Sequence, residues 1–214
     1  MKYQYILFDL DGTLTDSGEG IMNSGRYALE QLGYEVPDLE TLRTMVGPPL
    51  DSSFRRFGVP DELIEEAIRQ YRVSYIQMGR KYQNSVYPGI EEVLKKLKDL
   101  GYKLYVATSK PEELATDILT NFKLNGYFTY IAGATVDHSR KTKSEVLEYV
   151  LKMIEDKSKA IMIGDTHYDV VGANAHNLPC VGVSWGYGTV EDMKKAGATT
   201  IVTSVEELFN YLTD

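Results

Sequence analysis

Short apolar segments that alternate with amphipathic helical segments are the feature that most constrains the fold of this chain. Each apolar segment spans five to seven residues and is hydrophobic almost throughout, which is typical of strands that helices cover on both faces of a parallel sheet. The segments are residues 5–10, 102–108, 130–134, 160–165, 180–185 and 199–203. Between them lie helical patterns such as residues 89–101, where apolar side chains recur on one stripe. This alternation predicts an α/β fold with a doubly wound parallel sheet.

One long stretch interrupts the alternation. Residues 16–85 contain several helical patterns and no convincing strand, and Pro88 with Gly89 marks the return to the alternating pattern. We therefore expect residues 16–85 to form a small helical domain. It would be inserted into an α/β core made of residues 1–15 and 86–214.

Charge and hydropathy exclude several classes of partner. The 214-residue chain has a formal net charge of −8, so a nucleic-acid backbone would be repelled overall. No apolar run approaches the roughly 18 residues of a membrane span, and the first run ends at Asp9, too early for a secretory signal peptide. We expect a cytoplasmic protein that binds neither a nucleic-acid polymer nor a membrane. The sequence leaves its oligomeric state open.

Polar side chains gather where the predicted strands end. Ligands of open α/β sheets bind at the carboxyl ends of the strands, so the residues just past those ends are the candidates for chemistry. They are Asp9 and Asp11 after the first strand, Thr108, Ser109 and Lys110 after the second, Asp165 and Asp169 after the fourth, and the basic cluster at residues 140–143.

The four aspartates would repel one another unless a cation neutralised them. Mg²⁺ takes oxygen ligands and is usually held by one or two carboxylates together with a substrate phosphate. A carboxylate beside such a phosphate can attack it. A second carboxylate two residues further on, on the same side of the strand end, can protonate the leaving alcohol and then activate water. Hydroxyls and a lysine can stabilise the phosphoryl oxygens in the transition state. These residue types predict a Mg²⁺-dependent hydrolase of phosphate monoesters.

The segments "FDLDGTLTDS", "VATSKP" and "MIGDTHYDVVGA" resemble three motifs of the haloacid dehalogenase-like hydrolases, in the order and spacing of that superfamily. The resemblance implies a Rossmann-like core with a helical cap of the C1 type. It further implies that Asp9 is the nucleophile that forms an aspartyl-phosphate, and that Asp11 is the general acid/base with its backbone carbonyl on Mg²⁺. Thr108 would hydrogen-bond the phosphoryl group. Asp165 would ligate Mg²⁺, with Asp169 nearby, either directly or through water.

The identification of the phosphate-binding lysine and of the substrate depends on finer features of the resemblance. Lys143 is favoured as that lysine because it opens the helix "SEVLEYVL", where the family's lysine usually stands, and Lys141 is the alternative. The lysine segment lacks the family's Lys-Pro-x-Pro pattern, and "VGPPL" at residues 46–50 resembles the 5′-nucleotidase-like branch. We therefore expect a phosphatase for a small phosphorylated metabolite, either phosphoglycolate phosphatase-like or 5′-nucleotidase-like.

Several alternatives stay open. A sugar-phosphate mutase of the β-phosphoglucomutase type keeps the same acids, and a non-catalytic module could accept phosphate on aspartate as receiver domains do. Arg43, in the expected helical domain, is a candidate for substrate contact. Ser109 is a candidate both for substrate binding and for capping the next helix. The spacing of His138, His167 and His176 fits no zinc pattern, so we expect these three at the surface or in local hydrogen bonds.

Overall fold

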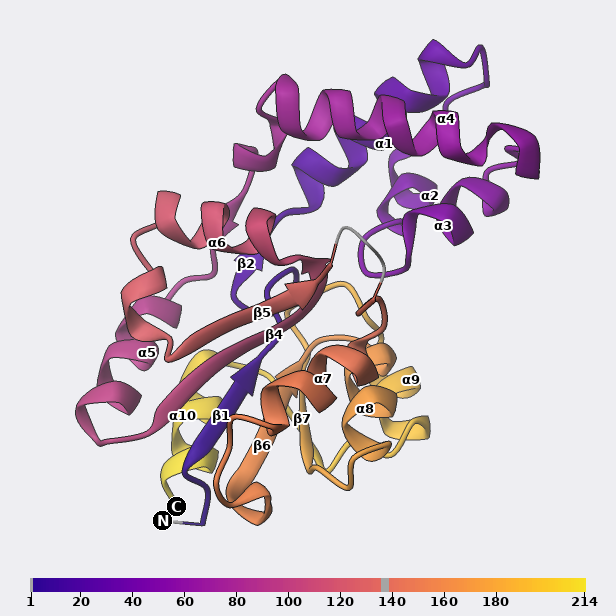
Figure 1. The fold of residues 1–214 in the computed structure, drawn as a ribbon. Helices are drawn as coiled ribbons and strands as arrows, with labels where there is room; N and C mark the ends of the chain where they lie inside the picture. The colour runs from indigo at the N-terminus through magenta and orange to yellow at the C-terminus, as the bar shows by residue number, and fades with distance from the viewer. Residues whose placement is uncertain (1, 136–138) are drawn as a thin grey trace. The chain divides into compact units, whose positions relative to one another are not determined.

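The computed structural model of the chain describes residues 2–135 and 139–214 and falls into two compact units. An α/β unit consists of Met1–Thr15 and Val86–Asp214, and a helical unit consists of Asp16–Ser85 (Figure 1). His138 lies outside the described residues, so its surface position stays a prediction.

The α/β unit is built on a six-stranded sheet with the order β5-β4-β1-β6-β7-β8. Its strands are β1 (Tyr5–Phe8), β4 (Lys103–Pro111), β5 (Tyr130–Ala134), β6 (Ala160–Gly164), β7 (Cys180–Val183) and β8 (Thr200–Val202). All neighbouring strands pair in parallel, and Phe8 of β1 lies opposite Val106 of β4 and Ile163 of β6. Each strand falls within one of the segments predicted from apolar runs or extends one by a few residues. The predicted α/β fold is therefore confirmed.

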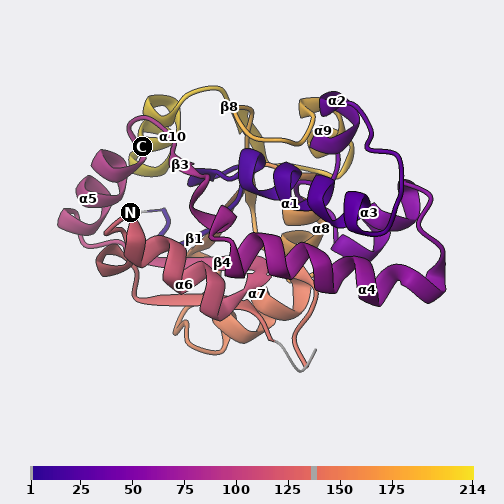
Figure 2. The ribbon, with the colours of Figure 1, turned by 90° about the horizontal axis from the view of Figure 1, so that it is seen from above.

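Helices cover both faces of this sheet, because successive strand residues point to opposite sides. Ile6 and Phe8 join the apolar cluster formed with α5, α6 and α10, whereas Tyr5 and Leu7 join the cluster formed with α7, α8 and α9. Figure 2 shows α10 and α7 on opposite sides of β1. The helices are α5 (Ile90–Asp99), α6 (Glu112–Asn121), α7 (Lys143–Leu151), α8 (His167–Asn174), α9 (Val190–Lys195) and α10 (Val205–Thr213), with short 3₁₀ turns at Asn125–Tyr127 and Lys157–Lys159.

The helical unit has buried side chains of its own, among them Leu29, Leu42 and Phe54. Its elements are α1 (Gly18–Gln31), α2 (Leu39–Arg43), α3 (Leu50–Arg56), α4 (Asp61–Arg72), the π-helix η1 (Val73–Gln77) and the 3₁₀-helix η2 (Arg80–Tyr82). Where the chain leaves and re-enters the α/β unit, β2 (Thr15–Asp16) pairs with β3 (Ser85–Val86), a ribbon that the sequence patterns did not predict. Across the described part of the chain, every helix is too short or too polar to cross a membrane.

Candidate active site

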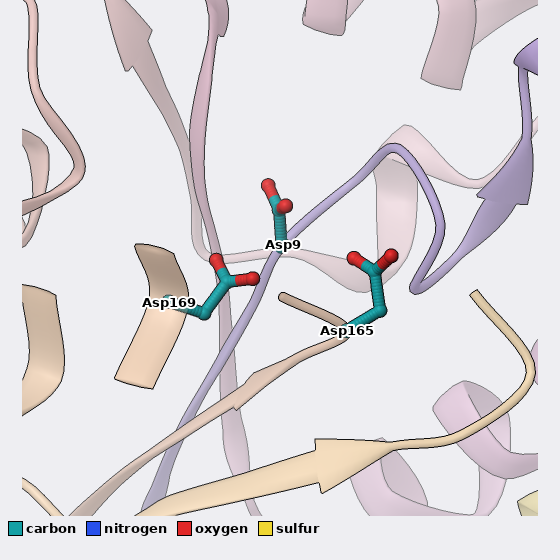
Figure 3. A group of neighbouring side chains, drawn as sticks. All are labelled: Asp9, Asp165 and Asp169. Atoms are coloured by element: carbon teal, nitrogen blue, oxygen red, sulfur yellow. The ribbon is translucent and has the colours of Figure 1, made fainter. Parts of the chain in front are cut away.

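Three aspartates converge at the carboxyl edge of the sheet. Asp9 directly follows β1, Asp165 directly follows β6, and Asp169 lies in the first turn of α8. Because β1 and β6 are adjacent and parallel, their ends bring the first two acids together. One oxygen from each of the three carboxylates lies within 4.8 Å of the others, and Figure 3 shows the three side chains projecting to the same side. Such a set of oxygen ligands could hold a hard divalent cation.

Asp165 is fully buried and is fixed in place by its neighbours. Its Oδ2 accepts a hydrogen bond from the backbone N–H of Tyr187 at 2.8 Å, and its Oδ1 accepts one from the Thr13 hydroxyl at 3.3 Å. Burial raises the pKa of the Asp165 carboxyl, and the charges of Asp169 and Asp9 raise it further. A bound cation would offset this cost, since it favours the ionised carboxylate.

The Asp165 carboxylate occupies space that is open only because glycines surround it. A Cβ at Gly12 or at Gly186 would collide with the Asp165 side chain, and Gly12 also has a φ of +83°, which side chains rarely adopt. The loop after β1 is tied to the loop after β7, because the Trp185 indole N–H donates to the Thr13 carbonyl at 3.2 Å. Sequence reasoning missed Gly186, although the glycine-rich "GYG" at residues 186–188 directly follows the predicted strand at residues 180–185.

Lys143 links two of the three aspartates. Its Nζ lies 2.7 Å from Asp9 Oδ1 and 2.8 Å from Asp169 Oδ1, and it donates to the Ala107 carbonyl at 2.8 Å. Lys143 is buried, whereas Lys141 is exposed and contributes its backbone N–H to the Glu145 carboxylate. Of the two lysines considered from the sequence, the structure therefore brings Lys143 to the acids.

Burial and charge pull the pKa values of this cluster in opposite directions. Burial is the largest influence on Asp9 and, together with the charge of Asp169, it outweighs Lys143 and raises the pKa of Asp9 to about 6. Burial acts to lower the pKa of Lys143, but the charges of Asp169 and Asp9 outweigh it and leave that pKa raised. Lys143 therefore stays charged while it compensates two buried carboxylates.

Asp169 has both of its oxygens engaged. Oδ2 accepts hydrogen bonds from the Thr166 backbone N–H at 3.0 Å and from the Thr166 hydroxyl at 2.9 Å, as part of a capping box that starts α8. Oδ1 forms the ion pair with Lys143. The helix N-cap is Thr166, which leaves the Asp165 side chain free of a capping role.

A second lysine pairs with the remaining acid. Lys110 Nζ lies 3.0 Å from Asp11 Oδ1 and 2.8 Å from Asp11 Oδ2, and the Lys110 side chain is only 5% exposed. Sequence reasoning noted Lys110 beyond the second predicted strand but gave it no role. Two acids two residues apart thus carry separate ammonium partners, with Lys143 on Asp9 and Lys110 on Asp11.

The hydroxyl candidates differ in their surroundings. Thr108 is buried near the end of β4, and its Oγ1 accepts a hydrogen bond from the Lys110 backbone N–H at 3.3 Å. Ser109 is exposed, and the expectation that it caps the next helix was wrong, because α6 has Pro111 at its N-cap and no side-chain cap hydrogen bond. Arg43 is exposed at the end of α2 in the helical unit, so its contact with substrate stays a prediction.

The histidines within the described residues have local roles. His167 is exposed and its ring lies against that of Tyr168, with 4.0 Å between centroids. His176 is within hydrogen-bond distance of Ser144 through its Nε2, at 3.0 Å from the hydroxyl and 2.8 Å from the carbonyl. These contacts agree with the expected surface and local hydrogen-bonding roles.

Three comparisons connect this geometry to known proteins. The family model of the haloacid dehalogenase-like hydrolases matches residues 6–183. The tyrosine-protein kinase PtkA of Mycobacterium tuberculosis is 42% identical over 209 residues, which cover 96% of this chain and 71% of that protein. A 5′-nucleotidase of Pseudomonas aeruginosa is 38% identical over 196 residues, covering 91% and 88%. The crystal structure of a predicted phosphatase from Clostridium acetobutylicum superposes with a TM-score of 0.93 at 45% identity, covering 100% and 99%.

Proposed function

The chain belongs to the haloacid dehalogenase-like hydrolase family as a phosphoric monoester hydrolase, and from that premise we propose that it cleaves a small phosphorylated metabolite through an aspartyl-phosphate on Asp9. One observation carries the proposal. The carboxylate of Asp9 lies at the carboxyl edge of the sheet within a cluster of two further carboxylates and one lysine. That combination suits a dianionic phosphate, because a cation and an ammonium can bind its oxygens while a carboxylate attacks the phosphorus.

We propose Mg²⁺ as the cation. The donor set is entirely carboxylate oxygen, and one ammonium, that of Lys143, faces two of these three buried carboxylates. Asp9 and Asp165 would hold the ion together with the backbone carbonyl of Asp11. Asp169 would act through water, because Thr166 and Lys143 already occupy its oxygens. When bound, the ion would neutralise charge on the phosphoryl oxygens and polarise the phosphorus.

Gly186→Ala tests the site around Asp165. The added Cβ would overlap the Asp165 carboxylate and force it to move, so we expect Mg²⁺ affinity, measured by titration calorimetry, to fall about 10- to 100-fold. Gly126→Ala is the matched control, because a Cβ there meets nothing within 4 Å. Unchanged affinity in a folded Gly186→Ala variant would show that Asp165 does not hold the ion.

In the first chemical step, a carboxylate oxygen of Asp9 attacks phosphorus and forms an Asp9–O–P bond. The bond from phosphorus to the ester oxygen breaks, and Asp11 gives its proton to that oxygen, so that the alcohol leaves neutral. In the second step Asp11 takes a proton from water, the water oxygen attacks phosphorus, and the Asp9–O–P bond breaks to release phosphate. The Thr108 hydroxyl and Lys143 would stabilise the charge on the phosphoryl oxygens in both steps.

The helical unit would serve as a cap. We propose that residues 16–85 close over bound substrate, exclude bulk water during phosphoryl transfer and reopen for product release. Arg43, at the exposed end of α2, would then contact an anionic group of the substrate.

A panel of phosphate esters tests the proposed hydrolysis. Nucleoside 5′-monophosphates, phosphoglycolate, a hexose 1-phosphate and p-nitrophenyl phosphate would be assayed with Mg²⁺ and ranked by kcat/KM. Because a 38% identical relative is a 5′-nucleotidase, nucleoside 5′-monophosphates would be tested first. Hexose 1-phosphate that is isomerised without release of phosphate would identify a mutase. If none of the esters in the panel releases phosphate, the proposal is contradicted.

Removal of the cation should abolish activity. We expect EDTA to reduce phosphate release at least about 100-fold, because the charge that builds on the phosphoryl oxygens would then be left mainly to Lys143 and Thr108. Adding Mg²⁺ in excess of EDTA should restore the rate, and adding Na⁺ at matched ionic strength is the control. Full activity in EDTA would exclude a cation from the reaction.

The 42% identical kinase favours a second candidate, in which a tyrosine hydroxyl replaces water as the phosphoryl acceptor. Asp9 would attack the γ-phosphorus of ATP and ADP would leave. In the second step Asp11 would take the proton of the tyrosine hydroxyl, and the tyrosine oxygen would attack phosphorus in place of water and break the Asp9–O–P bond. Incubation with γ-labelled ATP and a tyrosine-containing polypeptide separates the two functions. Label on tyrosine would favour phosphotransfer, and label released only as inorganic phosphate would favour hydrolysis.

A further inference from the structure

We propose that Lys110 is the residue that positions Asp11, and that it sets the rate of the chemical steps while contributing little to substrate binding. The proposal rests on the hydrolytic function proposed above, in which Asp11 carries the proton in both steps. The ammonium of Lys110 forms an ion pair with Asp11, whereas Asp9 and Asp169 share the ammonium of Lys143.

The ammonium of Lys110 reaches both oxygens of Asp11. The two Nζ–Oδ distances are 3.0 and 2.8 Å, and the side chains of Lys110 and Asp11 are 5% and 15% exposed. A contact to both oxygens fixes the rotation of the carboxylate as well as its position. Exclusion of solvent makes the interaction stronger than that of a surface ion pair.

The backbone on each side of this pair is also held. Lys110 lies where β4 shifts register against β5, between Ala107 and Pro111, and its N–H donates to the Thr108 hydroxyl oxygen. Asp11 lies in a tight loop, in which the Gly12 N–H donates to the Thr15 carbonyl at 2.8 Å. The pair therefore joins two anchored segments that are 99 residues apart in the sequence.

Asp11 needs such a partner because of where it lies. Two residues away, the Asp9 carboxylate repels it, and Lys143 is engaged with Asp9 and Asp169. Without Lys110, Asp11 would turn away from Asp9 toward solvent. Proton transfer requires the acid within hydrogen-bond reach of the ester oxygen, so this rotation would slow both chemical steps. The phosphoryl group itself would still be bound by the other groups of the site.

The test is Lys110→Met, assayed with an alkyl phosphate that wild type hydrolyses. We expect kcat to fall about 10- to 100-fold, the range for the loss of a hydrogen bond to a charged group. KM should change by less than about threefold, because the groups that bind substrate equally in the ground state and in the transition state are kept. The matched control is Lys195→Met, which removes an exposed ion pair with Glu191 in the same unit and should leave kcat and KM unchanged.

A chemical rescue separates positioning from structure. Lys110→Cys should be as slow as Lys110→Met, and S-aminoethylation of the introduced thiol with bromoethylamine rebuilds an ammonium on a side chain of the same length. Selective labelling is feasible because the chain's single natural cysteine, Cys180, is buried and burial raises its pKa. Mass spectrometry should find one adduct on the variant and none on wild type. We expect the adduct to restore most of kcat.

The outcomes distinguish the inference from its premise. Wild type that hydrolyses no phosphate ester would overturn the proposed function, and this inference with it. Active wild type with an unchanged kcat in Lys110→Met, or with a raised KM alone, would overturn only the positioning role. If Lys110→Met does not fold, Lys110→Cys before and after aminoethylation makes the same comparison. A folded adduct without recovery of kcat would overturn the role of the ammonium.

Discussion

Asp9→Asn should reduce hydrolysis of p-nitrophenyl phosphate to background, by about 10⁴-fold or more. An amide has the shape of the carboxylate but is not a nucleophile toward phosphorus, so no aspartyl-phosphate can form. The release of p-nitrophenolate with Mg²⁺ would measure the loss. Borohydride trapping of the phosphorylated residue, followed by mass spectrometry, should label wild type at Asp9 and leave the variant unlabelled.

We expect the Asp9→Asn variant to keep its fold. In the absence of a cation, the variant should be more stable than wild type at neutral pH. The pKa of Asp9 is about 6 in the folded chain against an ordinary value of 3.8, so between these values the folded chain binds more protons than the unfolded chain. The free energy of unfolding of wild type therefore falls as pH rises from about 4 to about 6. Asp9→Asn lacks this loss, so above pH 6 it should gain up to about 3 kcal/mol, a net figure that already includes the opposing effect of Lys143 on the pKa of Asp9.

Chemical denaturation in EDTA at pH 4 and pH 7 would measure this difference. Asp99→Asn is the control for removing an exposed aspartate that pairs with Lys95 on α5, and it should leave activity unchanged and alter the free energy of unfolding by less than about 1 kcal/mol. Substantial phosphatase activity in a folded Asp9→Asn variant would disprove the nucleophilic role of Asp9.

The sequence predicted the sheet well because its strands are buried on both faces. A continuous apolar run such as residues 160–165 is too short for a typical buried helix and too apolar for a surface loop, and β6 lies within that run. The ribbon of β2 and β3 was not predicted, because each strand has only two residues and is too short to show the alternating pattern of a strand. The helical segment at residues 16–85 was visible as an interruption, and the structure makes Asp16–Ser85 a separate compact unit.

The site could be predicted where its residues follow a strand end or begin the next helix. Asp9 and Asp165 directly follow strands and Asp169 lies in the first turn of α8, and the structure brings the three together. Lys143 was favoured over Lys141 from its place at the start of a helix, and helical period supports that choice, because Lys143 begins the buried stripe of α7 that continues with Val146. The pairing of Lys110 with Asp11 and the close approach of Gly186 to the Asp165 side chain depend on how distant loops meet, and no local sequence pattern shows this.

Lys143→Met should have the largest effect on stability. The substitution keeps the length and apolar stem of the side chain but removes the ammonium from a site that is 5% exposed. Two buried carboxylates, on Asp9 and Asp169, then lose their common partner, and the Ala107 carbonyl loses a donor. Removing one partner of a buried ion pair costs about 3–5 kcal/mol, so we expect a loss of that size in the free energy of unfolding at pH 7 without a cation.

The control lies at the other end of the same helix. Lys152 forms an ion pair with Glu148 at 3.1 Å, with both side chains more than half exposed. Lys152→Met should change the free energy of unfolding by less than about 0.5 kcal/mol. A similar small effect for Lys143→Met would show that the buried ion pairs do not exist in solution.

The pH dependence identifies the cause of the destabilisation. Without Lys143 the pKa of Asp9 should rise above its value of about 6, since the charge that lowers it is removed. A carboxyl with a raised pKa in the folded state takes up protons on folding, so the variant should regain stability as pH falls from 7 toward 5. Wild type should regain less over the same range. A loss that is independent of pH would point to packing around Lys143 as the cause, and Mg²⁺ should reduce the loss at pH 7 by supplying the missing positive charge.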